Sequence, residues 1–160
     1  MLKPYLDSDF KLLQKWVTDE SLLLQFSGTD FTFPITKKQI TDYQNKNPDR
    51  RFYVGFTEDN LPFAFGEIIP QVTKIPRLGR ILVGDQNLRG KGLGKKFIGM
   101  LLQECALKFH CIKVELLVWD KNYQAIKCYQ SVGFSYDSSK HLTLVHKENT
   151  YHIHKMTYQF

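Results

Sequence analysis

The 160-residue chain has none of the long apolar runs, about 18 residues, that a membrane-spanning helix requires. Its first ten residues, MLKPYLDSDF, contain acidic side chains where a signal peptide would keep an apolar core, which argues against secretion. Cysteine is scarce: Cys105, Cys111 and Cys128 are odd in number and show no metal-ligand spacing. These absences predict a reduced, cytoplasmic protein with no disulfide framework, no metal site and no membrane partner.

Linkers and repeats are missing as well. No segment rich in proline, glycine or serine divides the chain, and no stretch repeats another, so residues 1–160 are expected to form a single domain. A chain of this length buries roughly two-thirds of its unfolded surface. Its apolar content of 42% and charged content of 24% are those of a globular protein, which excludes a disordered or fibrous chain.

Positive charge is concentrated in the second half of the chain. Residues 1–80 hold 11 Lys and Arg against 10 Asp and Glu, a net charge of +1, whereas residues 81–160 hold 11 against 6, a net charge of +5. This imbalance favours an anionic partner for the second half, although a solvated basic face would have the same composition. A nucleic-acid-binding domain is one alternative, but the chain has no recognised reader motif and its charge gathers at one loop.

Hydrophobic periodicity predicts a mixed α/β fold of about six to seven strands and about four helices, in the rough order β, two helices, three strands, helix, strand, helix, two strands. The helix after residue 92 should connect two parallel strands, because a crossover of this kind joins parallel neighbours. The expected helices lie in 7–26, 37–47, 93–109 and 122–132, and the expected strands after the first two helices lie in 50–71 (two), 77–85, 113–119, 133–137 and 150–160.

The segment LRGKGLGKKF, residues 88–97, joins an apolar strand to an amphipathic helix. Glycines let a backbone approach a phosphate closely, and a helix N-terminus offers unpaired N–H groups with a partial positive charge. The segment is therefore interpreted as a diphosphate-binding loop, while a solvated turn before a helix stays open as the alternative. Neither the dinucleotide fingerprint nor the nucleoside-triphosphate loop fits, because the residues after Gly92 and Gly94 have the wrong spacing.

Arg89-x-x-Gly92-x-Gly94 matches the R/Q-x-x-G-x-G/A signature of the GNAT superfamily of acetyl-CoA-dependent N-acetyltransferases, which the sequence resembles along essentially its whole length. NYQAIKCYQSVGF, residues 122–134, resembles a later segment of that family. The resemblance implies a GNAT fold, with a mixed sheet that splays between its fourth and fifth strands to admit a pantetheine arm. It also implies transfer of an acetyl group from acetyl-CoA directly to a primary amine, with no covalent intermediate on a cysteine and no metal.

The resemblance also implies which residues hold the cofactor. Backbone groups at the end of the fourth strand should pair with pantetheine and polarise the thioester, namely those of Leu82, Val83 and Gly84. The pyrophosphate should be held by Arg89, Gly90, Lys91, Gly92, Leu93, Gly94 and Lys95. Asn122 matches an asparagine that contacts the pantetheine arm, and its alternative role as a helix N-cap is compatible with that contact.

Two residues are predicted to be catalytic. Tyr129 matches the family's general acid, which protonates the departing thiolate, although packing of a helix residue against the sheet is the ordinary alternative. Glu67 is the candidate general base, since alternation along its strand places it among Phe63, Phe65 and Ile69, where burial should raise its pKa. A structural ion pair stays open for Glu67. Asp85 is the nearest acid to the fourth strand, in a segment that is typical of a turn.

The amine acceptor is expected to bind beside the first two helices and the segment that joins them, with walls from Phe26, Phe31 and Phe33 and with Asp30 attracting an ammonium group. Packing of the same loop against the core would use the same aromatic residues. A small-molecule amine and a peptide N-terminus both remain open as acceptors, as do a monomer and a homodimer. A catalytically inactive acyl-CoA-binding module is the alternative function, because no general base is obvious.

Overall fold

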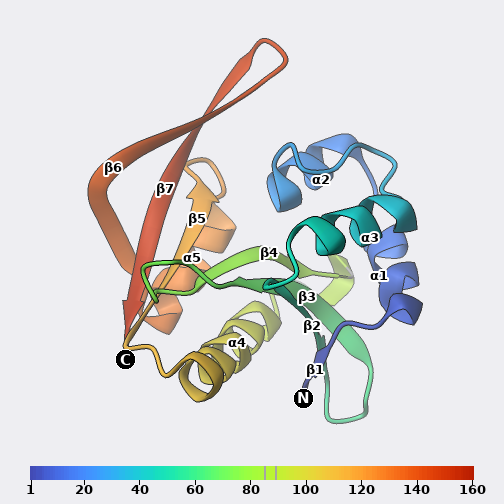
Figure 1. The fold of residues 1–160 in the computed structure, drawn as a ribbon, viewed down its shortest axis with the longest axis horizontal. Coiled ribbons are helices and arrows are strands. Elements are labelled where there is room, and N and C mark those ends of the chain that lie inside the picture. The colour runs from blue at the N-terminus through green and yellow to red at the C-terminus, as the bar shows by residue number, and fades with distance from the viewer. Residues whose placement is uncertain (85, 89) are drawn as a thin grey trace.

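The computed structural model describes residues 1–84, 86–88 and 90–160. Within them it contains seven strands, five α-helices and two short 3-10 helices (Figure 1). In chain order these are β1 Leu2–Pro4, η1 Asp7–Asp9, α1 Phe10–Trp16, α2 Glu20–Ser27, α3 Lys37–Lys46, β2 Arg51–Phe56, β3 Pro62–Ile69, β4 Arg77–Val83, η2 Gln86–Leu88, α4 Leu93–Phe109, β5 Lys113–Trp119, α5 Tyr123–Val132, β6 Ser135–His146 and β7 Asn149–Gln159. No helix among the described residues is long and apolar enough to cross a membrane.

All seven strands form one sheet in the order β1-β2-β3-β4-β5-β7-β6. Every neighbouring pair is antiparallel except β4 and β5, which are parallel and are joined through α4. This confirms the predicted crossover and the mixed sheet of six to seven strands.

Two apolar clusters hold the helices against the sheet. One lies between the sheet and α4 with α5, and its fully buried residues include Phe97, Leu101 and Met156. The other lies between α1–α3 and strands β2–β4, and includes Leu13 and Phe65. Figure 1 accordingly shows α1–α3 gathered on one side of the sheet and α4 on the other.

The first predicted helix is interrupted. Helix α1 ends at Trp16, Val17 is extended, and the side chain of Asp19 accepts the Leu22 N–H at 2.8 Å, so that a new helix starts at Glu20. An aspartate in this position satisfies an N–H group that has no partner inside the helix. The expected count of about four helices is therefore one too low. The other expected caps are confirmed: the Thr36 side chain caps α3, and Gly133 ends α5 in the left-handed conformation with φ 117°.

The last two strands form a long hairpin that returns to the N-terminal half (Figure 1). Strand β6 was expected only over 133–137 but continues to His146, with a register shift between Asp137 and Leu142. At the hairpin turn the Lys147 ammonium lies 2.8 Å from the Glu20 carboxylate of α2, and both side chains are more than half exposed. Strands β5, β7 and β6 form one half of the sheet. Away from the hairpin turn in this half-sheet, Lys155 of β7 lies 2.8 Å from the nearly buried Glu115 of β5.

Candidate active site

Strands β4 and β5 separate soon after they meet. Their register consists of two pairs, Arg77 with Glu115 and Leu78 with Leu116, among the residues that the structure describes. Beyond Leu78, β4 continues to Val83 and β5 continues to Trp119 without pairing to each other. The predicted splay between the fourth and fifth strands is thus present.

The end of β4 borders this gap. The Gly84 N–H donates to the Phe63 carbonyl of β3 at 2.8 Å, and Leu82 is paired with Phe65. In an antiparallel ladder, the N–H and C=O groups of successive residues point to opposite sides of the strand. The N–H and C=O groups of Leu82 and Gly84 therefore point toward β3, and those of Val83 point toward β5. Gly84 is also fixed by packing, since a Cβ there would lie 2.1 Å from the Trp16 ring.

The glycine-rich loop lies at the start of α4. Gly90 and Gly92 both have φ of 76°, a conformation that disfavours any residue with a Cβ. Apart from their chain neighbours, no described residue has an atom within 4 Å of where their Cβ atoms would be. Gly92 is the N-cap of α4 and provides no side chain to its N–H groups. Lys91 and Lys95 are exposed beside it. The loop therefore presents an uncapped helix N-terminus with positive charge around it, as the sequence predicted; Arg89 and Asp85 lie outside the described residues.

Gly94 is the place where the three candidate segments meet. A Cβ on Gly94 would lie 3.7 Å from Val83 of β4 and 3.2 Å from the Cys128 sulfur of α5. The end of β4, the first turn of α4 and the middle of α5 are thus in contact through one residue without a side chain. Tyr129, which follows Cys128, is brought to the same region.

Tyr129 is 7% exposed and its ring packs near Phe134, with ring centroids 6.1 Å apart. Burial raises the pKa of Tyr129 above its ordinary value, so its hydroxyl stays protonated through the neutral range. Within residues 1–84, 86–88 and 90–160, the hydroxyl has no hydrogen-bond partner. The Tyr129 hydroxyl therefore carries a proton that it could donate.

Asn122 is the N-cap of α5, and its side-chain oxygen accepts the Ala125 N–H at 3.3 Å. This is the capping role that the sequence left open beside a cofactor contact. Capping uses only the oxygen, so the side-chain amide hydrogens can still donate to another group.

Glu67 is completely buried in β3, and both of its oxygens have partners. Oε1 accepts the Tyr43 hydroxyl at 2.8 Å, and Oε2 is paired with the Arg80 guanidinium. Burial raises the pKa of Glu67, while Arg80, Tyr43 and Arg50 act in the opposite direction. The structure thus provides the ion pair that the sequence left open for Glu67. Phe63 was expected on the same face of β3 as Glu67, but it packs against Phe97 of α4. A register shift against β2, at Gly55 and Phe56, breaks the alternation of side chains along β3.

Arg80 is the main residue that sequence reasoning missed. Strand β4 has a β-bulge here: Leu82 pairs with Phe65 and Gly79 pairs with Glu67, so β4 has one residue more than β3 between these two pairs. Arg80 lies in the bulge and has φ of 48°. Its side chain is 5% exposed and pairs with Asp30 as well as Glu67, while its Nε is buried without a hydrogen-bond partner in the described part of the chain. The signal in the sequence is an arginine inside an otherwise apolar strand, next to a glycine.

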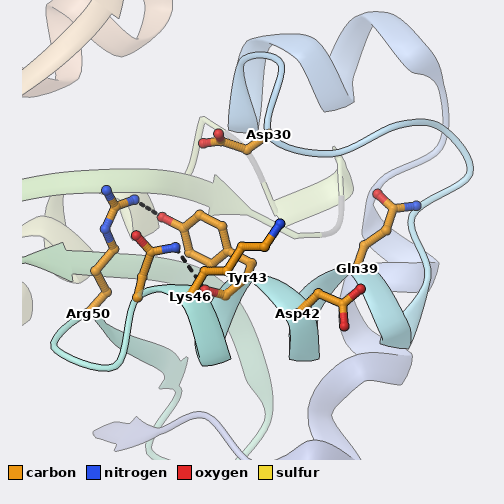
Figure 2. A pocket seen from close by; sticks show the side chains of 7 residues that line it. Asp30, Gln39, Asp42, Tyr43, Lys46 and Arg50 are labelled. Atoms are coloured by element: carbon orange, nitrogen blue, oxygen red, sulfur yellow. Dashed lines mark hydrogen bonds between the residues drawn. The ribbon is translucent and has the colours of Figure 1, made fainter.

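A hollow of about 350 Å³ lies between α3 and the segment that joins α2 to α3 (Figure 2). We call it the α3 hollow, and it is lined by Asp30, Gln39, Asp42, Tyr43, Lys46, Asn47 and Arg50. Tyr43 is 8% exposed and connects the hollow to Glu67 behind it. The hollow therefore lies where the acceptor was expected, beside the first helices.

The aromatic residues of this region divide between two roles. Phe26 and Phe31 are 7% and 6% exposed and belong to the apolar cluster under α1–α3, which is the packing role that the sequence left open. Phe33 is 44% exposed. The described residues contain no group of three or more His, Cys, Asp or Glu side chains that could hold a metal ion.

The splayed sheet and the uncapped loop define a GNAT-type acyltransferase fold, and the family model named Acetyltransferase (GNAT) family matches residues 13–134. The chain belongs to this family. Among curated proteins, the spermine/spermidine N(1)-acetyltransferase of Bacillus subtilis (strain 168) is 31% identical over 83 residues, which are 49% of this chain and 55% of the relative. The match thus spans about half the length of that relative.

Solved structures show the same fold at low sequence identity. The spermidine N-acetyltransferase of Vibrio cholerae, in complex with CoA and spermine, gives a TM-score of 0.80 at 15% identity and covers 99% of this chain and 94% of its own. The aminoglycoside acetyltransferase AAC(6')-Ib, in complex with coenzyme A, gives a TM-score of 0.77 at 16% identity and covers 99% and 94%. These likenesses support the fold along nearly the whole chain.

Proposed function

We propose that the protein is an N-acetyltransferase that transfers an acetyl group from acetyl-CoA directly to a primary amine. The observation that carries the proposal is the meeting of three features at Gly94: the open end of β4, the uncapped start of α4 and the Tyr129 region of α5. Solved relatives with this fold were crystallised with coenzyme A, which is consistent with a coenzyme A site here.

The loop residues fit a diphosphate. The N–H groups at the start of α4, from Gly92 to Lys95, have no side-chain cap and would donate to the pyrophosphate oxygens. Gly90 and Gly92 allow the backbone to turn there, and Lys91 and Lys95 add attraction for the anion. Arg89 is also predicted to bind the pyrophosphate, on the basis of the sequence motif alone.

The chemical step needs an aligned carbonyl and a proton donor. Acetyl-CoA supplies a thioester, which is reactive enough for an amine to attack without an enzyme nucleophile. Backbone groups at the end of β4, predicted to be those of Leu82, Val83 and Gly84, would hold the pantetheine arm and polarise the thioester carbonyl. As the new C–N bond forms and the C–S bond breaks, Tyr129 would give its proton to the departing thiolate. The Asn122 amide would hold the pantetheine arm.

Glu67 remains the predicted base for the amine proton. Since Glu67 has no exposed surface, a proton from the α3 hollow could reach it only through the Tyr43 hydroxyl, which donates to its Oε1. The amine acceptor would bind on this side of the sheet. The proposal also includes a reducing compartment, because all three cysteines are free thiols.

The test has two parts. Isothermal titration calorimetry with coenzyme A is expected to show binding, which Gly92→Ala weakens. A mass-spectrometric screen of an amine panel with acetyl-CoA is then expected to yield an acetylated product. Binding of coenzyme A without any product would favour the inactive acyl-CoA-binding module, and no binding of coenzyme A would reject both functions.

A further inference from the structure

The charged residues of the α3 hollow differ in how far they are already neutralised. Its lining includes two acids, Asp30 and Asp42, and two bases, Lys46 and Arg50, so that its formal charge is zero. Figure 2 shows the Lys46 side chain in front of Tyr43, with its ammonium group between the labelled Asp30 and Asp42 in this view.

Both acids have cationic partners from outside the hollow. Asp30 pairs with Arg80, whose guanidinium is almost completely buried, and Asp42 lies 2.6 Å from the Lys38 ammonium one turn earlier on α3. A carboxylate that already has a partner attracts a further ammonium group less strongly. The acidic side of the hollow is therefore largely neutralised before any ligand enters.

On the basic side, Arg50 has the buried Glu67 as a partner, whereas Lys46 has no such partner among the described residues. Lys46 forms no hydrogen bond or ion pair with the described residues, and the Arg50 guanidinium donates to the Tyr43 hydroxyl and stays 4.0 Å from Glu67. A second hollow of about 490 Å³ adjoins the first, shares Lys46 and Arg50 with it, and adds Arg77 and Asp49. The cations thus stand at the junction of two hollows, where a ligand can reach them.

The α3 hollow is connected to β4, the strand of the thioester site, by one ion pair. Asp30 of the α3 hollow is tied to Arg80, and Arg80 precedes Val83 by three residues of β4. An acceptor that extends from the thioester end of β4 past Arg80 could bring its far end to the cations of the hollow.

We propose that the acceptor carries a carboxylate, bound by Lys46 and Arg50, at the end opposite to its reacting amine. This inference rests on the proposed function and names its substrate class: a short peptide, acetylated at its N-terminus. A polyamine fits this lining less well, because Asp30 and Asp42 already have cationic partners and Asp49 of the second hollow is left to bind its several ammonium groups.

The experiment measures binding first. Protein saturated with coenzyme A is titrated calorimetrically with L-alanine, di-, tri- and tetra-alanine, with the C-terminal amides of the same compounds, and with spermidine. The di-, tri- and tetra-alanine acids are expected to bind more tightly than L-alanine, and their amides at least about tenfold more weakly than the acids, because the charge-assisted hydrogen bonds are lost. Lys46→Gln should reduce this difference between acid and amide, with Arg50 retaining part of it. Lys37→Gln, which removes the same charge from the first residue of α3, should preserve it.

Equal binding of acid and amide, tighter binding of spermidine, or an unchanged preference in Lys46→Gln would overturn the inference. So would failure of every alanine compound to bind. Turnover with acetyl-CoA is measured separately, so the two proposals can fail independently. Carboxylate-dependent binding without acetylated product keeps the anionic subsite and rejects the acetyltransferase, whereas acetylation of spermidine alone keeps the acetyltransferase and rejects the subsite.

Discussion

Replacing Glu67 by glutamine removes the charge of a completely buried carboxyl group that pairs with Arg80 and accepts the Tyr43 hydroxyl. Removal of one partner from a buried ion pair costs about 3–5 kcal/mol, because the other charge is left without compensation. Here Asp30 remains beside Arg80, so we expect the lower end of that range, about 3 kcal/mol. For a chain of this size such a loss lowers Tm by roughly 6–12 °C.

The assay is urea denaturation, with thermal melting as a second measure, on the wild type and Glu67→Gln. Asp42→Asn is the matched control: it breaks an exposed pair with Lys38 on one helix and should cost no more than about 0.5 kcal/mol. The double variant Glu67→Leu/Arg80→Met should be more stable than Glu67→Gln, since it leaves no buried charge unpaired. If Glu67→Gln changes the free energy of unfolding no more than Asp42→Asn does, the reasoning about this buried pair is refuted.

Three other outcomes are expected. Tyr129→Phe should lower kcat by about 10²–10⁴-fold with the affinity for coenzyme A unchanged, and an undiminished kcat would exclude it as the general acid. Gly92→Ala should cost about 1–2 kcal/mol of stability and weaken coenzyme A binding in calorimetry, since alanine disfavours φ of 76°, whereas Gly99→Ala in the interior of α4 should preserve binding. The pKa of Asp137 is lowered to about 2 by hydrogen bonds from the Ser139 hydroxyl and N–H. Its stabilisation is therefore present above about pH 4 and lost as the pH falls to 2, so Asp137→Asn should melt below the wild type at pH 5 but with it at pH 2.

Local patterns were sufficient to predict much of the fold and of the cofactor side. Helix periodicity and the caps at Thr36 and Gly133 depend on neighbouring residues, and both are confirmed. The parallel pairing of β4 and β5 follows from a single crossover helix, and the gap between them followed from the family resemblance. The glycine-rich start of α4, with Gly92 as its N-cap, was likewise indicated by one short motif.

The acceptor side depended on contacts between distant segments. Arg80 reaches Glu67 and Asp30 because a bulge in β4 turns it into that face, and a bulge is set by the register against β3, which the sequence of one strand does not specify. The interruption at Val17 was missed because the apolar spacing continues through it. The full length of β6 was missed because its central residues are polar and its pairing depends on β7.

The two ends of the half-sheet formed by β5, β7 and β6 are fastened to the rest of the protein with different strengths. Glu115 and Lys155 form a sheltered ion pair at the end where β5 still pairs with β4, whereas the hairpin tip touches α2 through the exposed Glu20 and Lys147. An exposed pair contributes at most about 1 kcal/mol, and dissolved ions weaken it further. Raising the ionic strength should therefore weaken the contact between the hairpin tip and α2, while the ion pair between Glu115 and Lys155 stays intact. Salt should thus loosen one end of this half-sheet and not the other.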